Sequence, residues 1–290
     1  GDAAPGAEEF VMSNFLRTMV LMVVLTFLFV WVGGALGGRE GAVSAFVMVS
    51  ALNFFAYFFS DKMVLKRYRA KEVDARSEPR YYGIVARLVE RAGIPMPKVY
   101  VIPDRTPNAF ATGRNPRHAA VAATEGILEM LDDDELAGVM AHELAHVKHR
   151  DILTGTIAAT FAGAIAMLGR FAASGQGQKS SSNPLALMLA AVAAPIAAVV
   201  IRMAISRTRE FAADAGGADI SGQPDGLADA LIKISSGGRG RGLLRHLNSA
   251  HAHLFIVNPL RGGGGLMQLF ASHPPMEERV ARLRAMDVER

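Results

Sequence analysis

Two histidines and a glutamate stand close together near the middle of this 290-residue chain. His142 and His146 are four positions apart, which places both imidazoles on one face of a helix and within reach of one metal ion. Glu143 lies between them, where its carboxylate can take a proton from a water that the metal activates. This His-Glu-x-x-His pattern predicts a hydrolytic metal site with Glu143 as the general base.

The surrounding residues favour a helix that begins near Asp132. The four acidic residues at 132–135 provide a capping side chain and negative charge at the helix start. Apolar residues then recur with helical spacing: Leu136, Val139, Met140, Leu144 and Val147. Such a helix would hold the two histidines at a fixed separation.

A catalytic zinc takes three protein ligands and leaves one position for water. The chain has 0 Cys, so the third ligand must be a histidine or a carboxylate. The candidates are His149, Asp151, Glu210, Asp214, His251, His253 and His273.

Residues 209–214 offer the favoured third ligand. Glu210 and Asp214 are one helical turn apart, so Glu210 can bind zinc while Asp214 accepts the other N–H of a ligand histidine. The alternative is an ordinary solvated acidic face, which the neighbouring Phe and Ala residues disfavour. His149 is less suitable because it lies toward another face of its helix.

Composition indicates a membrane part joined to a soluble part. Hydrophobic residues make up 51% of the chain, and the mean hydropathy is +0.23. A net charge of only +4 gives no support to nucleic-acid binding. Four apolar runs stand out, and the first two are long enough to cross a hydrocarbon core of about 30 Å. The runs are 15–36, 42–59, 152–168 and 184–205.

Runs three and four are less hydrophobic than the first two. The alternative to two membrane spans here is a pair of buried helices in a soluble domain. Basic residues follow runs two and four, so the positive-inside rule places both hairpin tips outside and the catalytic parts in the cytosol. The predicted division is a leader or expression scar (1–11), a transmembrane hairpin (12–60), a first protease part (61–151), a second hairpin (152–205) and a second protease part (206–290).

The soluble part is predicted to be α+β and mainly α. Its expected helices are 79–91, the zinc helix, a segment around Glu210, 225–234 and 276–286, and its expected strands are 98–102, 108–111 and 119–123.

Four motifs together resemble one known family. The chain has HELAH (142–146), a hydrophobic hairpin, REFAAD (209–214) and SHPP (272–275). This combination, over residues 12–290, is similar to the HtpX heat-shock membrane metalloproteases, relatives of the CAAX prenyl endopeptidases among the gluzincins. The resemblance implies Glu210 as third zinc ligand, Glu143 as base and Asp214 behind a ligand histidine. The Gly- and His-rich segment 237–270 departs from the family pattern and stays unassigned.

Two further motifs have both a functional and a structural interpretation. Asn108, Ala109, Phe110 and Ala111 resemble the family's active-site edge strand, which an extended peptide can join by backbone hydrogen bonds. The same residues could form a plain core strand. By resemblance, His273 lies near the site and hydrogen-bonds the tetrahedral oxyanion, and the alternative is a helix-entry loop.

The sequence thus predicts a zinc endopeptidase with one Zn²⁺ per chain, anchored by four helices in the bacterial inner membrane. Its expected partners are the bilayer and protein substrates, and no nucleic acid. The family resemblance implies that these substrates are misfolded or damaged membrane proteins. Two rivals are a membrane transporter or channel with a metal site and a catalytically silent scaffold. The four runs are nearly free of ionisable residues, which disfavours a transporter.

Overall fold

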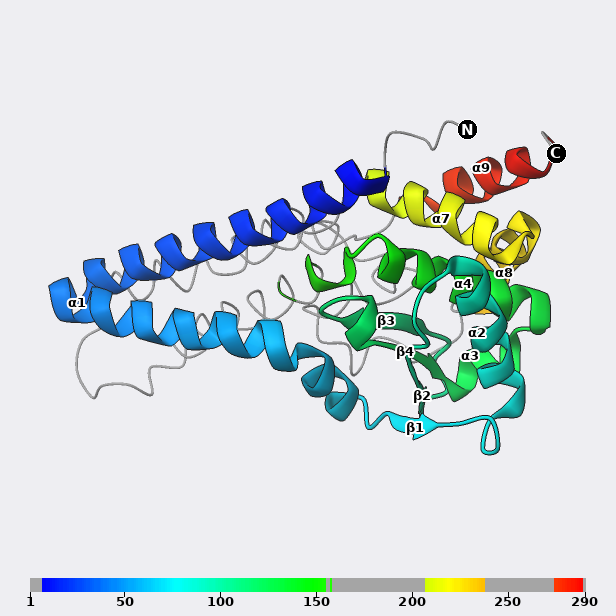
Figure 1. The fold of residues 1–290 in the computed structure, drawn as a ribbon, viewed down its shortest axis with the longest axis horizontal. Helices are drawn as coiled ribbons and strands as arrows, with labels where there is room; N and C mark the ends of the chain where they lie inside the picture. The colour runs from blue at the N-terminus through cyan, green and yellow to red at the C-terminus, as the bar shows by residue number, and fades with distance from the viewer. Residues whose placement is uncertain (1–6, 155–156, 158–206, 238–273, 289–290) are drawn as a thin grey trace.

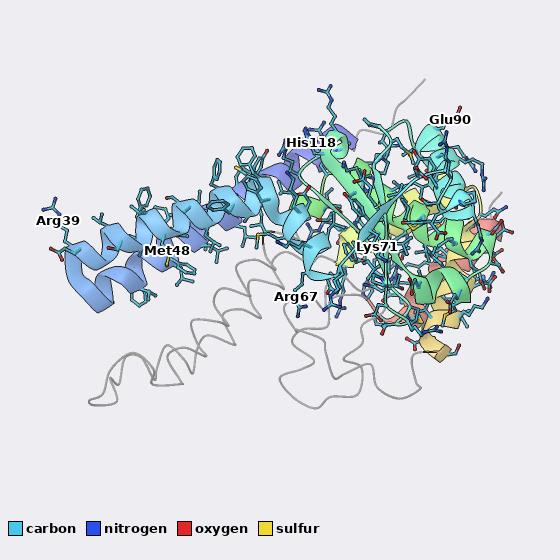
Figure 2. All side chains as sticks on the ribbon, turned by 90° about the horizontal axis from the view of Figure 1, so that it is seen from below. Arg39, Met48, Arg67, Lys71, Glu90 and His118 are labelled. Carbon is cyan, nitrogen blue, oxygen red and sulfur yellow. The ribbon has the colours of Figure 1, made fainter. Side chains whose placement is uncertain are left out.

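The structure is a computed structural model that describes residues 7–154, 157, 207–237 and 274–288. Its longest element, α1 (Ala7–Arg67), is a hairpin of two helical arms that projects from the rest of the protein (Figure 1). The chain reverses at Gly37 and Gly38, and Gly38 has a φ of 60° that suits a residue without a side chain. Arg39 lies at the far tip of the hairpin and Arg67 where it joins the folded part (Figure 2).

Both arms of α1 are suited to a membrane. Thr18–Ala35 and Gly37–Phe59 are long and apolar enough to cross one. Large apolar side chains such as Phe27 and Trp31 are about 70% exposed, as expected of a surface that faces lipid. Thr26 and Asn53 hydrogen-bond between the arms, and Thr18 lies 2.6 Å from Thr154, which follows the predicted zinc helix. The predicted runs 15–36 and 42–59 fall within α1.

A small mixed sheet follows the hairpin. It contains β1 (Lys71–Val73), β2 (Lys98–Ile102), β3 (Ala109–Gly113) and β4 (Ala119–Thr124), in the order β1-β2-β4-β3. β2 and β4 are parallel, whereas β1 and β3 pair antiparallel with their neighbours. Within the described residues β3 therefore forms an edge of the sheet. One sheet face packs against the end of α1 through Val64, Leu65 and Phe110.

Helices form the larger part of the core. They are α2 (Pro79–Ala92), α3 (Glu125–Met130), α4 (Asp133–Lys148), α7 (Arg207–Ser221), α8 (Pro224–Gly237) and α9 (Met276–Val288), with a 3-10 turn η1 (Pro116–His118) before β4. α4 is central, because it packs on α2, α7, α8 and β3. Leu136, Met140 and Leu144, the apolar stripe expected from the sequence, are fully buried there.

The predicted α+β, mainly helical class is confirmed for the described residues. The strand predicted at 98–102 has those bounds, while the strand predicted at 108–111 forms one residue later and extends to Gly113. β1 and α3 were not predicted. Runs three and four, from 152 to 205, lie outside the described residues except for 152–154 and 157, so the number of spans stays a prediction.

Candidate metal centre

The helix α4 is fixed at its start by the acidic residues that the sequence singled out. The side chain of Asp132 accepts hydrogen bonds from the backbone N–H groups of Asp134 and Glu135, at 3.1 and 2.9 Å. The Glu135 carboxylate accepts in return from the N–H of Asp132 at 2.9 Å, which completes a capping box. This cap and the buried apolar stripe hold the helix that carries the His-Glu-x-x-His pattern.

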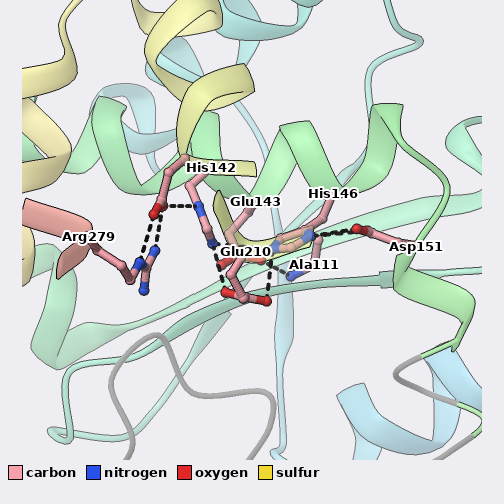
Figure 3. Close-up of polar contacts among 8 residues, drawn as sticks. Ala111, His142, Glu143, His146, Asp151, Glu210 and Arg279 are labelled. Carbon is pink, nitrogen blue, oxygen red and sulfur yellow. Dashed lines mark hydrogen bonds and ion pairs between the residues drawn. The ribbon is translucent and has the colours of Figure 1, made fainter. Parts of the chain in front are cut away.

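Three side chains from two helices converge on one point (Figure 3). His142 and His146 of α4 have their Nε2 atoms 3.2 Å apart. Glu210 of α7 presents its two carboxylate oxygens to these nitrogens: Oε2 lies 3.8 Å from Nε2 of His142, and Oε1 lies 3.8 Å from Nε2 of His146. The three donor atoms all lie within 4.8 Å of one another, and the residues are buried or half-buried.

These separations suit a zinc ion. With bonds of about 2.0–2.2 Å, two ligands of a tetrahedral zinc are about 3.3–3.6 Å apart. The observed 3.2 and 3.8 Å bracket that range, so small movements would bring all three donors to bonding distance. Two nitrogens and one carboxylate oxygen are also ligands that zinc accepts, and the set leaves a fourth position for water.

The His142 ring is held from behind by a charged pair. Its Nδ1 lies 3.0 Å from an Asp214 carboxylate oxygen. Arg279 of α9 donates two hydrogen bonds to the same carboxylate, at 2.6 and 2.9 Å, and all three side chains are about 2% exposed. Burial opposes ionisation of Asp214, but Arg279 and His142 outweigh it and hold the pKa of this carboxyl below its usual range. Asp214 is therefore an anion that orients His142.

Asp151 stands behind the other histidine. Its carboxylate oxygens lie 3.0 and 3.1 Å from Nδ1 of His146. Burial disfavours a charged ring, but the carboxylates of Asp151, Glu210 and Glu143 prevail and raise the pKa of His146 to about 10. Each candidate histidine ligand thus has a carboxylate on the nitrogen that faces away from the metal position, as is usual in zinc sites.

The catalytic candidate Glu143 is connected to the sheet. Its Oε2 accepts a hydrogen bond from the backbone N–H of Ala111 at 2.9 Å. Ala111 belongs to β3, and the N–H that it gives to Glu143 is on the side of this strand opposite β4. The Glu143 carboxylate, the candidate metal ligands and the edge of β3 therefore meet in one place.

A glycine allows α7 to approach α4 this closely. A Cβ atom added to Gly217 would lie 2.9 Å from both Cα and N of His142, which is closer than side chains normally come. Any larger residue at 217 would have to push the two helices apart. Since Glu210 and Asp214 belong to the same helix, the absent side chain at 217 helps to bring both carboxylates to the histidines.

The structure separates the predicted site residues into those it brings together and those it does not describe. His142, Glu143, His146, Glu210 and Asp214 form one cluster (Figure 3). His149 is the C-cap residue that follows α4, and its ring lies beside Gly216. His251, His253 and His273 lie outside the described residues. The buried Arg279 had not been predicted, and Asp151 had been considered only as a ligand.

Comparison with known proteins agrees with this site. Residues 75–287 match Peptidase family M48. The "Protease HtpX homolog" of Methylibium petroleiphilum is 55% identical over 285 residues, which cover 96% of this chain and 100% of the relative. That of Syntrophotalea carbinolica is 53% identical over 95% of this chain and 99% of the relative. The chain therefore belongs to Peptidase family M48, as a zinc metallopeptidase homologous to the HtpX proteases.

One solved structure has a similar fold. The crystal structure of S. mikatae Ste24p superposes with a TM-score of 0.52 at 18% sequence identity. The match covers 95% of this chain and 66% of Ste24p. At this level of identity the likeness concerns the fold alone.

Proposed function

We propose that this protein is a membrane-anchored zinc endopeptidase that cleaves misfolded or damaged membrane proteins on the cytosolic side of the bacterial inner membrane. In this role it would serve membrane protein quality control under stress. The observation that carries the proposal is the cluster of His142, His146 and Glu210 beside Glu143 and the edge of β3, at the base of an apolar hairpin.

The chain's own residues can perform the steps of peptide hydrolysis. Zinc held by His142, His146 and Glu210 would polarise the scissile carbonyl and make the attacking water more acidic. The carboxylate of Glu143 accepts the proton of that water and passes it to the nitrogen of the departing amine. Asp214 and Asp151 keep the two imidazoles oriented, and Arg279 keeps Asp214 charged and in place.

The edge of β3 is proposed to bind the substrate as an added strand. Its position at the edge of the described sheet and its contact with Glu143 support this function for residues 108–111. A substrate that pairs with β3 would pass directly in front of the proton acceptor. His273 is proposed, by family resemblance, to hydrogen-bond the oxyanion of the tetrahedral intermediate.

Charge and hydropathy support the proposed localisation. The second arm of α1 ends in Lys66 and Arg67, whereas Arg39 at the hairpin tip is the only lysine or arginine from residue 18 to residue 59. This asymmetry supports a cytosolic catalytic part, with the segment 152–205 as a second transmembrane hairpin. A transporter finds less support, because the metal site lies on α4 and α7 and not within the two candidate spans.

The direct test is metal content paired with proteolysis. Detergent-purified protein should contain about one zinc per chain and cleave casein. A chelator should abolish cleavage, and added zinc should restore it. Full cleavage by a preparation shown to be free of metal would overturn the proposal.

Substitutions test the third ligand. Glu210→Ala removes a donor and should lose most zinc affinity, whereas His149→Ala should keep it. Glu129→Gln, on an exposed helix position, is the matched control for loss of a carboxylate. Zinc binding that survives Glu210→Ala but not His149→Ala would show that the ligand assignment is wrong.

A further inference from the structure

The strand β3 runs alongside the last turns of α1, in the opposite direction. At one end the rings of Tyr68 and Phe110 have their centroids 5.7 Å apart. At the other end the guanidinium carbon of Arg114 lies 5.3 Å from the ring centroid of Phe58. The ten positions from 58 to 68, helical as far as Arg67, span about 15 Å, and the four positions from 110 to 114, of which the last follows the end of β3, span about 13 Å when extended. The two lengths agree, so helix and strand lie side by side over this distance.

The membrane boundary on this helix can be located from the sequence and contacts. The apolar candidate span ends at Phe59. Asp61 and Lys62 follow at once, and the Lys62 ammonium lies 5.6 Å from the ring of Phe59. Aromatic rings followed by charges are typical of the interface between lipid and water. The guanidinium of Arg114, in contact with the Phe58 ring, is therefore level with the membrane surface, and β3, which ends one residue before Arg114, lies on the cytosolic side of it.

The distance of the Glu143 carboxylate from the membrane surface can be measured along β3. Glu143 is hydrogen-bonded to Ala111, which is three residues before Arg114. Three extended residues correspond to about 10 Å. The packing of Val64 and Leu65 on the sheet agrees with this distance, because these two residues lie just past the end of the candidate span on α1. The proton acceptor is thus held about 10 Å below the membrane surface.

We propose that the protease is built to cut membrane proteins in the segment that directly adjoins a transmembrane span, about three residues beyond its cytosolic end. This inference rests on the proposed function, in which β3 binds substrate as an added strand. A substrate span beside α1 leaves the membrane level with Phe58, and an extended chain then needs about three residues to reach the level of Ala111.

Spacer length should therefore control cleavage. With no spacer, or with one residue, the scissile bond stays at the membrane surface and cannot reach Glu143 unless the substrate helix unwinds. With a longer spacer the chain must loop, and loop closure adds a cost that grows only slowly with length. The rate should rise steeply up to about three residues and decline gently beyond about six.

The experiment uses the full-length protease in phosphatidylcholine vesicles containing phosphatidylglycerol. Single-span substrates carry one cleavable sequence, separated from the span by Gly/Ser spacers of zero to about twenty residues, in both chain orientations. The same cleavable sequence as a free soluble peptide is the reference, and the Glu143→Gln protein is the blank. Mass spectrometry identifies the bond that is cut.

In at least one orientation, kcat/KM should be about tenfold or more higher at three to five residues than at zero or one. The free peptide should be cut at one rate in every preparation. A tethered series with the same rate at all spacer lengths, alongside a cleaved free peptide, would overturn the inference and leave the proposed function intact. Failure to cut the free peptide as well would count against the proposed function itself.

Discussion

The backbone N–H of Ala111 donates a hydrogen bond to the carboxylate of Glu143 across 2.9 Å. This contact joins the edge of the sheet to the helix that carries the candidate zinc ligands, over 32 positions of sequence. A substrate that extends the sheet at β3 would consequently lie against the group proposed to move the proton. Substrate position and proton transfer would be set by the same pair of elements.

Strand addition at β3 makes a prediction about proline. A peptide held by backbone hydrogen bonds loses a donor and fixes its φ angle when proline replaces a pairing residue. Proline scanning along a cleaved peptide should therefore give positions at which cleavage falls strongly, while alanine at the same positions has a small effect. Rates are measured by chromatography of the products. Equal cleavage of all proline-containing and parent peptides would exclude strand addition.

The two carboxylates behind the histidines should contribute differently. Asp214→Asn and Asp151→Asn should each weaken zinc binding by about 10–100-fold, because each removes the anion that orients a ligand ring. Asp214→Asn should also lower stability by about 3–5 kcal/mol, since it leaves Arg279 buried without its ionic partner. Zinc competition assays and thermal unfolding measure the two effects.

Asp133→Asn is the matched control for these variants, because Asp133 has a 67% exposed side chain and lies at the start of the same helix. It should bind zinc like the unmodified protein. If both Asp214→Asn and Asp151→Asn also bind zinc as this control does, neither carboxylate orients a ligand.

The close approach of α7 to α4 can be tested at a glycine. Gly217→Ala places a methyl group against the backbone of His142, so the helices must separate and Glu210 must move away from the histidines. Zinc affinity should fall and the protein should lose about 1–3 kcal/mol of stability. Gly83→Ala is the control, because an added Cβ there meets nothing closer than 3.9 Å. Unchanged zinc affinity in a folded Gly217→Ala protein would show that this contact does not position Glu210.

The membrane topology can be mapped with fused reporters. A reporter that is active only outside the cytosol should be active at Gly38 and at Gly177 and silent at Arg290, because basic residues stay on the cytosolic side. Activity at Arg290 would reverse the proposed orientation. Silence at Gly177 alone would instead make 152–205 a hairpin buried in the cytosolic domain.

Local signals explain what could be predicted from the sequence. The acidic cap at Asp132, the apolar stripe of α4 and the histidine spacing all act within a few residues, so the helix and its three candidate side chains could be predicted from the sequence. The bounds of β2 were likewise predicted from a short apolar run between turn signals. The coarse division into an apolar hairpin and an α+β part follows from hydropathy in the same way.

Contacts between distant segments explain what was missed. Arg279 reaches Asp214 across 65 positions, and nothing in its own helix distinguishes it from the other arginines of α9. β1 is only three residues long and largely exposed, so it exists because it pairs with β2. Asp151 reaches His146 because the chain reverses at Arg150, whose φ of 57° is rare outside glycine and is not encoded in any visible pattern.

The measurement that tests the central claim most directly is zinc content and proteolysis of the Glu143→Gln protein, determined on one preparation. Glutamine keeps the shape of the side chain and both histidines but removes the proton acceptor. The variant should retain about one zinc per chain and lose nearly all cleavage of casein, while Glu129→Gln keeps both. Cleavage at the unmodified rate by a zinc-loaded Glu143→Gln protein would contradict the proposed mechanism.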